Sequence, residues 1–371
     1  MASLPLSIGV IYRIPALLYI PSDTLLAFAE KRFSARDEDA EYLVLRRGRK
    51  TGTSHQPQPQ LQSAVYTARV MLPGHRTMNP CPVYEWKSQT VFLFFICVRQ
   101  HVSEQWQIWT GQNAARLCYV WSGDAGQTWS SLTDLTEQVI GEDLKDWATF
   151  AVGPGHGVQL RSGRLVIPAY AYHITARCCH LPLPWGTQPQ SLVFYSDDGG
   201  QRWHKGELIE GMKTVECQVA EVACQACDPV LYCNARTPYR CRAAALSTDQ
   251  GLTFKRPSSC KKLCESPHGC QGSVVSFTPT TGTTMSWLLY SHPTSKRKRV
   301  NLGIYLNRSP LNEAKWEHPW FLYQGACGYS DLAVCQEASA PLLFGCLFEC
   351  GVNHACEEIA FQLFCFEDLQ S

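Results

Sequence analysis

The sequence has no hydrophobic run long enough to cross a membrane. Its longest apolar run, residues 91–98, has eight residues, whereas a transmembrane helix needs about 20. The N-terminus also lacks a secretory signal, because no basic segment opens the chain and Arg13 interrupts the first apolar stretch. We therefore expect a protein without a transmembrane segment and without a signal peptide.

The sequence also has little net charge. Its 33 Lys and Arg against 32 Asp and Glu give a formal charge of +1, which provides no long-range attraction to nucleic acid. The glycine-rich segment 153–157 is not followed by the Lys-Ser/Thr pair of a phosphate loop. We expect neither a nucleic-acid partner nor a nucleotide cofactor.

Cysteine is abundant, with 19 residues, but its spacing does not indicate a metal site. Cys224 and Cys227 are spaced like half of a zinc site, and no second pair stands at a matching distance. Without a secretory signal, the expected state is reduced, buried thiols in a protein that faces the cytosol. We expect no metal and no other cofactor.

Helical periodicity and Gly/Ser linkers are almost absent, and short β-rich runs recur between turn residues. Many short strands at fairly even spacing are typical of an all-β sandwich, barrel or propeller. Because no linker or charge run divides the chain, we predict one domain over residues 1–371. The β-rich runs are residues 91–98, 165–172, 191–196, 287–291, 302–306, 343–348 and 359–366.

An internal repeat decides among these β architectures. A segment of the form Ser-x-Asp-x-Gly-x-Thr-Trp begins at residue 122, and similar segments begin at residues 196 and 247. The pattern predicts a hairpin turn: Ser and Asp accept backbone N–H bonds, Gly takes a positive φ, and the aromatic ring packs beneath. Repeats of this length predict a six-bladed β-propeller whose structural turns are of the Asp-box type.

The hairpin at the start of the chain carries an unusual set of charges. Arg13 precedes one apolar strand, and the returning strand places Glu30 and Arg32 on one face, with Asp37 five residues further on. A guanidinium that Glu30 orients could hold a planar carboxylate. The other interpretation is a solvated hairpin end with ordinary surface charge, and these residues alone favour neither.

Together with Tyr-Arg-Ile-Pro at 12–15 and the three turns, further motifs make the chain resemble a vertebrate exo-sialidase (neuraminidase). The resemblance runs from Tyr12 to about Phe366. Within that family the chain is most similar to the plasma-membrane-associated ganglioside sialidase, and next to the cytosolic sialidase. The motifs are Thr-Met-Asn-Pro-Cys-Pro at 77–82, Trp-Ala-Thr-Phe-Ala-Val-Gly-Pro-Gly-His-Gly at 147–157 and Gly-Cys-Gln-Gly-Ser at 269–273.

The resemblance implies hydrolysis of terminal sialic acid, preferentially from gangliosides and also from oligosaccharides and glycoproteins. It implies peripheral contact with the plasma membrane, with endosomal membranes or the cytosol as further locations. A non-catalytic propeller that binds sialoglycans and a trans-sialidase remain the alternatives.

Sialic acid carries a carboxylate on its anomeric carbon, and the family binds this group with three arginines. The motifs identify them as Arg13, Arg236 and Arg299. Arg299 ends the basic run 296–299, which could equally be a solvated turn, and Arg297 is its nearest competitor. Charge-assisted bonds of about 1.5–3 kcal/mol each can dominate recognition of the substrate.

The resemblance further implies a tyrosine nucleophile, Tyr329, activated by Glu216. Sialidases are an exception to the two-carboxylate rule of glycosidases, and the ordinary tyrosine pKa of about 10 requires a neighbouring base. Glu216 also stands out by itself, because a carboxylate inside an apolar strand needs a partner. Asp37 is the implied acid/base; Glu38 and Asp39 are the alternatives that sequence alone does not separate.

The remaining sugar groups are assigned by the same resemblance. Arg32 is expected at the 4-hydroxyl. Two aromatic side chains two residues apart on a strand face the same side, as a pocket wall requires, although ordinary sheet packing gives the same pattern. The other assignments are Met78 and Asn79 at the N-acetyl group, Glu104, Tyr170 and Tyr172 at the glycerol arm, and Gln271 as a weaker pocket candidate.

Overall fold

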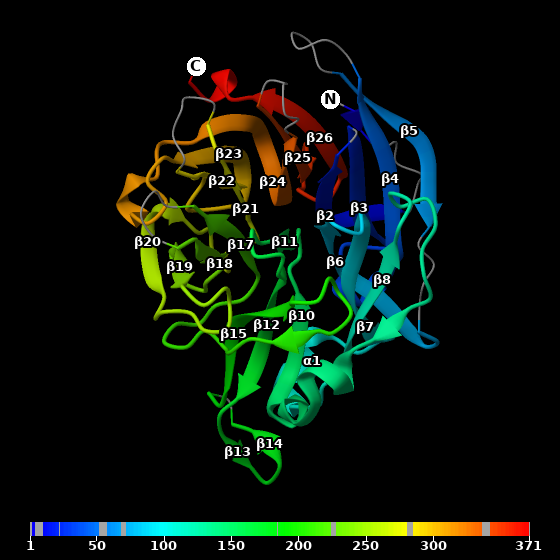
Figure 1. Ribbon diagram of the computed structural model, residues 1–371. Helices are drawn as coiled ribbons and strands as arrows, with labels where there is room; N and C mark the ends of the chain where they lie inside the picture. The colour runs from blue at the N-terminus through cyan, green and yellow to red at the C-terminus, as the bar shows by residue number, and fades with distance from the viewer. Residues whose placement is uncertain are drawn as a thin grey trace.

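The computed structural model describes residues 2–3, 10–21, 23–51, 58–67, 72–183, 185–223, 228–279, 285–335 and 342–370. Almost all regular structure in these residues is antiparallel strand. Five large sheets are arranged around a common centre like the blades of a propeller (Figure 1). The predicted all-β class and its propeller-like arrangement are confirmed.

The first four sheets each pair in chain order. Sheet one holds β2 (Ile11–Ile20), β3 (Thr24–Arg32), β4 (Ala40–Thr51) and β5 (Gln58–Thr67). Sheet two holds β6 (His75–Glu85), β7 (Thr90–Arg99), β8 (Ala115–Ser122) and β9 (Thr133–Asp134). Sheet three holds β10 (Trp147–Val152), β12 (Leu165–Ile174), β15 (Thr187–Ser196) and β16 (His204–Lys205), with β11 (Val158–Gln159) on β12. Sheet four holds β17 (Cys217–Val222), β18 (Val230–Ala235), β19 (Cys241–Ser247) and β20 (Ser258–Cys264).

The fifth sheet has seven strands and joins the two ends of the chain. One long strand, β24, pairs with β23 through its first half and with β25 through its second. The N-terminal strand β1 pairs with the last strand, β26. The strands are β21 (Ser273–Phe277), β22 (Trp287–Pro293), β23 (Val300–Asn307), β24 (Trp320–Cys335), β25 (Leu343–Gly351), β26 (Glu358–Cys365) and β1 (Ala2–Ser3).

Apolar side chains fill the space between neighbouring sheets, which explains why the ring closes. Phe28 of sheet one packs in a cluster with Leu93 of sheet two, and Phe94 of sheet two packs in another with Phe150 of sheet three. A further cluster joins Leu17 of sheet one to residues of the last sheet. The seven predicted β-rich runs all lie in strands, except that Phe366 is one residue beyond β26.

The three repeated turns share one hydrogen-bond pattern. In the first, the Ser122 hydroxyl accepts the Gly126 N–H at 2.9 Å, and Asp124 accepts the Thr128 N–H at 2.9 Å. Equivalent bonds occur in the turns at 196–203 and 247–254. The glycine of the first turn has φ +79°, a conformation that side chains disfavour.

One α-helix was not predicted: α1 (Glu104–Thr110), which Ser103 caps by accepting the Trp106 N–H. It is too short to show a helical period in the sequence. A two-stranded hairpin, β13 (Arg177–Cys178) and β14 (Leu181–Pro182), lies beside it. The remaining helical turns are η1 (Asp37–Asp39), η2 (Thr136–Ile140), η3 (Gly141–Asp146), η4 (Glu313–Lys315) and η5 (Glu367–Gln370).

Within the described ranges, no helix is long and apolar enough to cross a membrane. Across the same residues, no group of three or more His, Cys, Asp and Glu is placed to hold a metal ion. Cys224 and Cys227 lie outside the described residues.

Candidate active site

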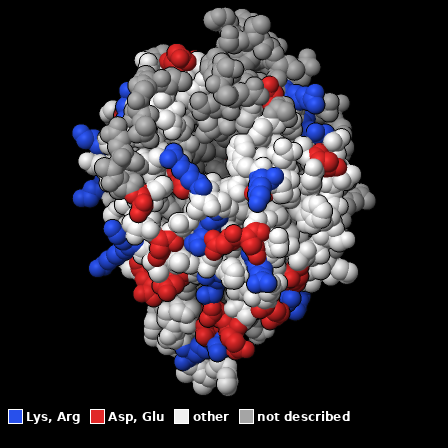
Figure 2. Space-filling model, viewed as in Figure 1, with Lys and Arg blue, Asp and Glu red and all other residues white. Residues whose placement is uncertain are grey.

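Most of the side chains identified from the sequence line a single cavity of about 290 Å³. The cavity lies near the centre of the ring, where residues from all five sheets meet, and charged side chains gather around the middle of this face (Figure 2). The predicted residues in its wall are Arg13, Arg32, Asp37, Met78, Asn79, Glu104, Tyr170, Glu216, Arg236, Arg299 and Tyr329.

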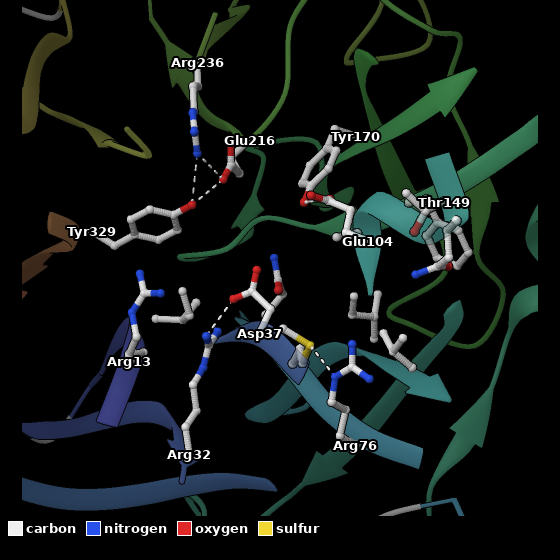
Figure 3. Close-up of a pocket in the computed structure, with 18 of the residues that line it drawn as sticks. Arg13, Arg32, Asp37, Arg76, Glu104, Thr149, Tyr170, Glu216, Arg236 and Tyr329 are labelled. Carbon is white, nitrogen blue, oxygen red and sulfur yellow. Dashed lines mark hydrogen bonds and ion pairs between the residues drawn. The ribbon is translucent and has the colours of Figure 1, made fainter. Parts of the chain in front are cut away.

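Tyr329, Glu216 and Arg236 form one hydrogen-bonded group (Figure 3). The Tyr329 hydroxyl donates to Glu216 Oε1 at 2.5 Å and accepts from Arg236 Nη1 at 3.1 Å. Burial, and then the negative charge of Glu216, raise the pKa of Tyr329 well above its ordinary value, so the phenol holds its proton. A carboxylate in contact with a protonated phenol is placed to remove that proton.

The guanidinium groups of Arg13 and Arg299 both lie close to the Tyr329 ring. Each guanidinium carbon is 5.7 Å from the centre of that ring. Arg299 is fixed by two donated bonds to the Gly269 carbonyl, at 2.8 and 3.2 Å. Arg297 is exposed and does not line the cavity. The structure therefore brings Arg13, Arg236 and Arg299 together.

Arg32 is held between two carboxylates. Its Nε donates to Glu30 Oε2 at 2.7 Å, and its Nη1 donates to Asp37 Oδ1 at 2.6 Å. Glu30 is fully buried, whereas the Asp37 side chain is 53% exposed toward the cavity mouth. The interpretation of this hairpin as a solvated end is wrong, because closure of the ring buries Glu30 and Arg32.

Glu30 lies behind Arg32, outside the cavity wall. Its other oxygen, Oε1, accepts the Asn79 N–H at 2.7 Å. Asn79 has φ +59°, a left-handed conformation that asparagine tolerates. Glu30 thus positions Arg32 and Asn79, and the structure gives it no contact with the cavity.

Glu104 enters the cavity from the first turn of α1. The Tyr170 hydroxyl donates to its Oε1 at 3.3 Å. Burial, and then the negative charges of Glu216 and Asp37, raise the pKa of Glu104 to about 7. Tyr172 packs edge-on against Tyr170 with ring centres 6.2 Å apart, but it does not line the cavity.

Gln271 is not a wall residue either. Its side chain is buried, donates to the carbonyls of Pro154 and Ser330, and accepts the Ser330 N–H at 3.0 Å. It therefore holds the backbone next to Tyr329.

Comparison with known proteins identifies the family. Residues 23–342 match the family described as BNR repeat-like domain. Sialidase-3 of Homo sapiens is 56% identical over 398 residues, covering 98% of this chain and 91% of the relative. The chain belongs to the sialidase family. Sialidase-4 of Mus musculus is 42% identical, covering 97% and 91%, and Sialidase-2 of Cricetulus griseus is 45% identical, covering 95% and 92%. The chain is accordingly a glycoside hydrolase with sialylated glycoconjugates as substrates, which sets aside the non-catalytic alternative.

Solved structures share the fold of this sialidase. The Hadza microbial sialidase Hz136 superposes with a TM-score of 0.75 at 23% identity, covering 97% of this chain and 66% of the other. The sialidase of Trypanosoma rangeli, in complex with 2,3-difluorosialic acid and described as a covalent intermediate, gives 0.68 at 17%, covering 97% and 54%. At such identities the likeness concerns the fold alone.

Among the residues at the site that the sequence analysis did not identify are two charged ones, Glu349 and Arg76. Glu349 accepts the Arg13 Nε–H, and its other oxygen accepts the Tyr329 N–H. Glu349 is a carboxylate within the apolar strand β25. A carboxylate within an apolar strand-like run is also the sequence feature that drew attention to Glu216. Arg76 lines the cavity and donates to the Arg99 and Val102 carbonyls at 2.9 and 2.8 Å. In the sequence, Arg76 directly precedes the Thr-Met-Asn-Pro-Cys-Pro motif at 77–82, and this position could have identified it.

Proposed function

We propose that this sialidase works with retention of configuration through a covalent intermediate on Tyr329. The observation that carries the proposal is the 2.5 Å contact between the Tyr329 hydroxyl and Glu216 Oε1, inside a group of arginines. The substrate carboxylate binds Arg13, Arg236 and Arg299. Since this carboxylate adjoins the reacting carbon, a neutral phenol approaches with less repulsion than a carboxylate nucleophile.

In the first step, Tyr329 Oη attacks the anomeric carbon while Glu216 takes the phenolic proton. The glycosidic C–O bond breaks, and Asp37 donates its proton to the departing oxygen. In the second step, Asp37 removes a proton from water, which attacks the same carbon. The C–Oη bond then breaks, and Glu216 returns the proton to Tyr329. Two displacements at one carbon give net retention.

The other wall residues take the roles assigned above: Arg32 at the 4-hydroxyl, Met78 and Asn79 at the N-acetyl group, and Glu104 and Tyr170 at the glycerol arm. Glu30, Tyr172 and Gln271 act from behind the wall, through the groups that they position.

The experiment is trapping with a 2,3-difluorosialic acid reagent followed by peptide mass spectrometry. We expect the sialyl mass on the peptide that contains Tyr329, and none on the Tyr329→Phe variant. Turnover of a fluorogenic sialoside should fall roughly a thousandfold or more in this variant. Equal turnover by both proteins would falsify the nucleophile assignment. Adding an acceptor sugar tests for a trans-sialidase, which would yield a new sialoside.

We also propose that gangliosides are the preferred substrates, with sialylated oligosaccharides and glycoproteins cleaved more slowly. This preference rests on the resemblance to the ganglioside sialidase, as does peripheral attachment to the plasma membrane and to endosomal membranes. Comparing release from mixed gangliosides, sialyllactose and a sialoglycoprotein tests it. Equal rates on all three would contradict the preference.

We further propose that residues 1–371 form one six-bladed propeller domain with Asp-box turns. Support comes from β24, whose two halves pair with different neighbours, as expected if it serves two blades of the seven-stranded sheet. The shared Ser and Asp hydrogen bonds of the three turns support the turn assignment. A single calorimetric unfolding transition is expected, and two separate transitions would contradict one domain.

A further inference from the structure

Four large apolar side chains are exposed on two adjoining elements beside the cavity. The exposed fractions are 41% for Trp106, 72% for Trp109, 55% for Leu181 and 70% for Trp185. We call these four side chains the indole surface. A single exposed apolar residue is ordinary, whereas several large ones on neighbouring elements indicate an interaction site.

Helix α1 connects the indole surface to the active site. Glu104 and Gln107, three residues apart, line the cavity. Trp106 and Trp109, also three residues apart, are exposed and absent from its wall. Residues at this spacing share a helix face. One face of α1 therefore forms part of the substrate site, and another face presents two indoles to the outside.

The hairpin β13–β14 extends the same surface. It follows the end of β12 beyond Tyr170, and Figure 1 shows it projecting from the ring next to α1. A Cβ placed on Gly111, the C-cap of α1, would lie 2.7 Å from a Pro182 carbon, so helix and hairpin touch. Arg177 anchors the hairpin by donating to the Lys145 carbonyl at 2.7 Å.

The charge of these two segments suits phosphate-bearing headgroups. Residues 105–113 and 175–190 contain no Asp or Glu, and their basic side chains are Arg177 and His180. Carboxylates occur on the adjacent η3, where Glu142 and Asp143 pair with Lys145 and Lys205. Tryptophan prefers the boundary between headgroups and acyl chains, because its ring is apolar and its N–H is polar.

We propose that the indole surface docks onto a phospholipid bilayer and so presents the cavity to sialic acid on glycolipids of the same bilayer. The inference rests on the proposed ganglioside preference, because a lipid-anchored substrate must be met at the membrane. Docking brings the enzyme and its substrate into one layer, and the second encounter then takes place at high effective concentration. Binding through apolar insertion does not require anionic lipid.

The experiment measures cosedimentation with phosphatidylcholine vesicles that contain no ganglioside, so that the active site contributes nothing. The double variant Trp109→Ala/Trp185→Ala is compared with Trp86→Ala/Trp121→Ala. The control removes two indoles that are 59% and 48% exposed on sheet two: Trp86 directly follows β6, and Trp121 pairs with Phe92 of β7, both away from the end of the sheet where Met78 and Val98 line the cavity. We expect wild type and the control to bind alike, and the first variant to bind about tenfold more weakly.

Both variants should hydrolyse a soluble fluorogenic sialoside at the wild-type rate, which shows that they are folded. On gangliosides in vesicles, only Trp109→Ala/Trp185→Ala should lose rate, through a raised apparent KM. A wild type that stays in the supernatant overturns the inference, and so does an equal loss of binding in the control. A dimer that the first variant converts to monomer, with vesicle binding unchanged, would show a self-association surface instead.

The experiments can overturn the ganglioside preference and the docking surface independently of each other. If wild type binds the vesicles through these indoles but cleaves vesicle-held gangliosides no faster than soluble sialosides, the ganglioside preference is overturned and the docking surface is supported. If gangliosides are preferred and loss of the indoles changes neither binding nor rate, the docking surface is overturned.

Discussion

Glu349 holds Arg13 in place: Arg13 Nε donates to Glu349 Oε1 at 3.1 Å, deep beneath the cavity. The same carboxylate accepts the Ile14 N–H at 3.0 Å and the Tyr329 N–H at 3.0 Å. Burial lowers the pKa of Arg13, but the charges of Glu349, Cys356 and Tyr329 and the hydrogen bond to Glu349 together raise it above its ordinary value, so the guanidinium stays charged. One buried carboxylate thereby sets the position of the arginine proposed to bind the substrate relative to the proposed nucleophile.

Glu349→Gln should lower kcat/KM about 10- to 100-fold, because it replaces charge-assisted bonds to Arg13 with neutral ones. The loss should appear largely in KM, since the proposed mechanism has Arg13 bind the substrate carboxylate in ground state and transition state alike. Steady-state kinetics with a fluorogenic sialoside measures it. A matched change, Glu358→Gln on the neighbouring strand β26, should leave both constants unchanged; an equal loss there would argue against the specific role of Glu349.

Asp37→Asn should lower kcat about 10²- to 10⁴-fold on natural sialosides, because the leaving alkoxide then departs unprotonated. Aryl sialosides need less protonation, so their first step should be affected far less. The measurement is the ratio of rates on an aryl sialoside and on sialyllactose. Equal losses on the two substrates would mean that Asp37 is not the acid, and Glu38 and Asp39 would be the next variants.

Glu104→Gln should flatten the pH dependence of KM around neutrality. The pKa of Glu104 is raised to about 7, so this carboxyl is neutral below that pH and charged above it. Its charge then repels the substrate carboxylate, so wild-type KM should rise as pH increases through 7. The Gln variant stays neutral throughout.

The raised pKa of Glu104 also makes the stability of the folded protein depend on pH. A carboxyl whose pKa is higher in the folded than in the unfolded state takes up a proton on folding between the two pKa values, so folding becomes less favourable as pH rises through that interval. Stability from this group therefore declines as pH rises from about 4.5 toward 7. Denaturant titrations of wild type and Glu104→Gln at both ends of this window measure it. Parallel pH curves for the two proteins would show that Glu104 does not titrate there.

Arg76→Lys should impair recognition of the glycerol arm. Arg76 donates to the Arg99 and Val102 carbonyls, immediately before the Ser103 cap of α1, and so fixes the start of the helix that carries Glu104. Lysine lacks the planar fork that reaches both carbonyls. We expect a KM several-fold higher for intact sialosides, about 1 kcal/mol for a lost hydrogen bond.

A sialoside with a shortened glycerol arm provides the control for Arg76. Its KM should be nearly the same in wild type and variant, because Glu104 has little left to bind. If the KM rises equally for both substrates, Arg76 maintains the shape of the whole cavity and has no specific effect on the part that binds the glycerol arm.

The sequence by itself determined the strands, the repeated turns and the identity of most wall residues. Alternating apolar runs and Ser-Asp-Gly turns depend on local backbone preferences, which neighbouring residues set. Eleven of the named residues reached the cavity wall because family motifs mark short segments whose side chains share a fixed direction.

Only the tertiary structure decided how residues far apart in the chain meet. The choice of Arg299 over Arg297 required the Gly269 carbonyl, from the connection between β20 and β21, and the Tyr329 ring, from β24. The positioning roles of Glu30, Gln271 and Glu349 follow from burial, which closure of the ring imposes and no local pattern encodes. The seven-residue α1, with Glu104 in the cavity wall and Trp106 and Trp109 exposed, became visible only in the tertiary structure.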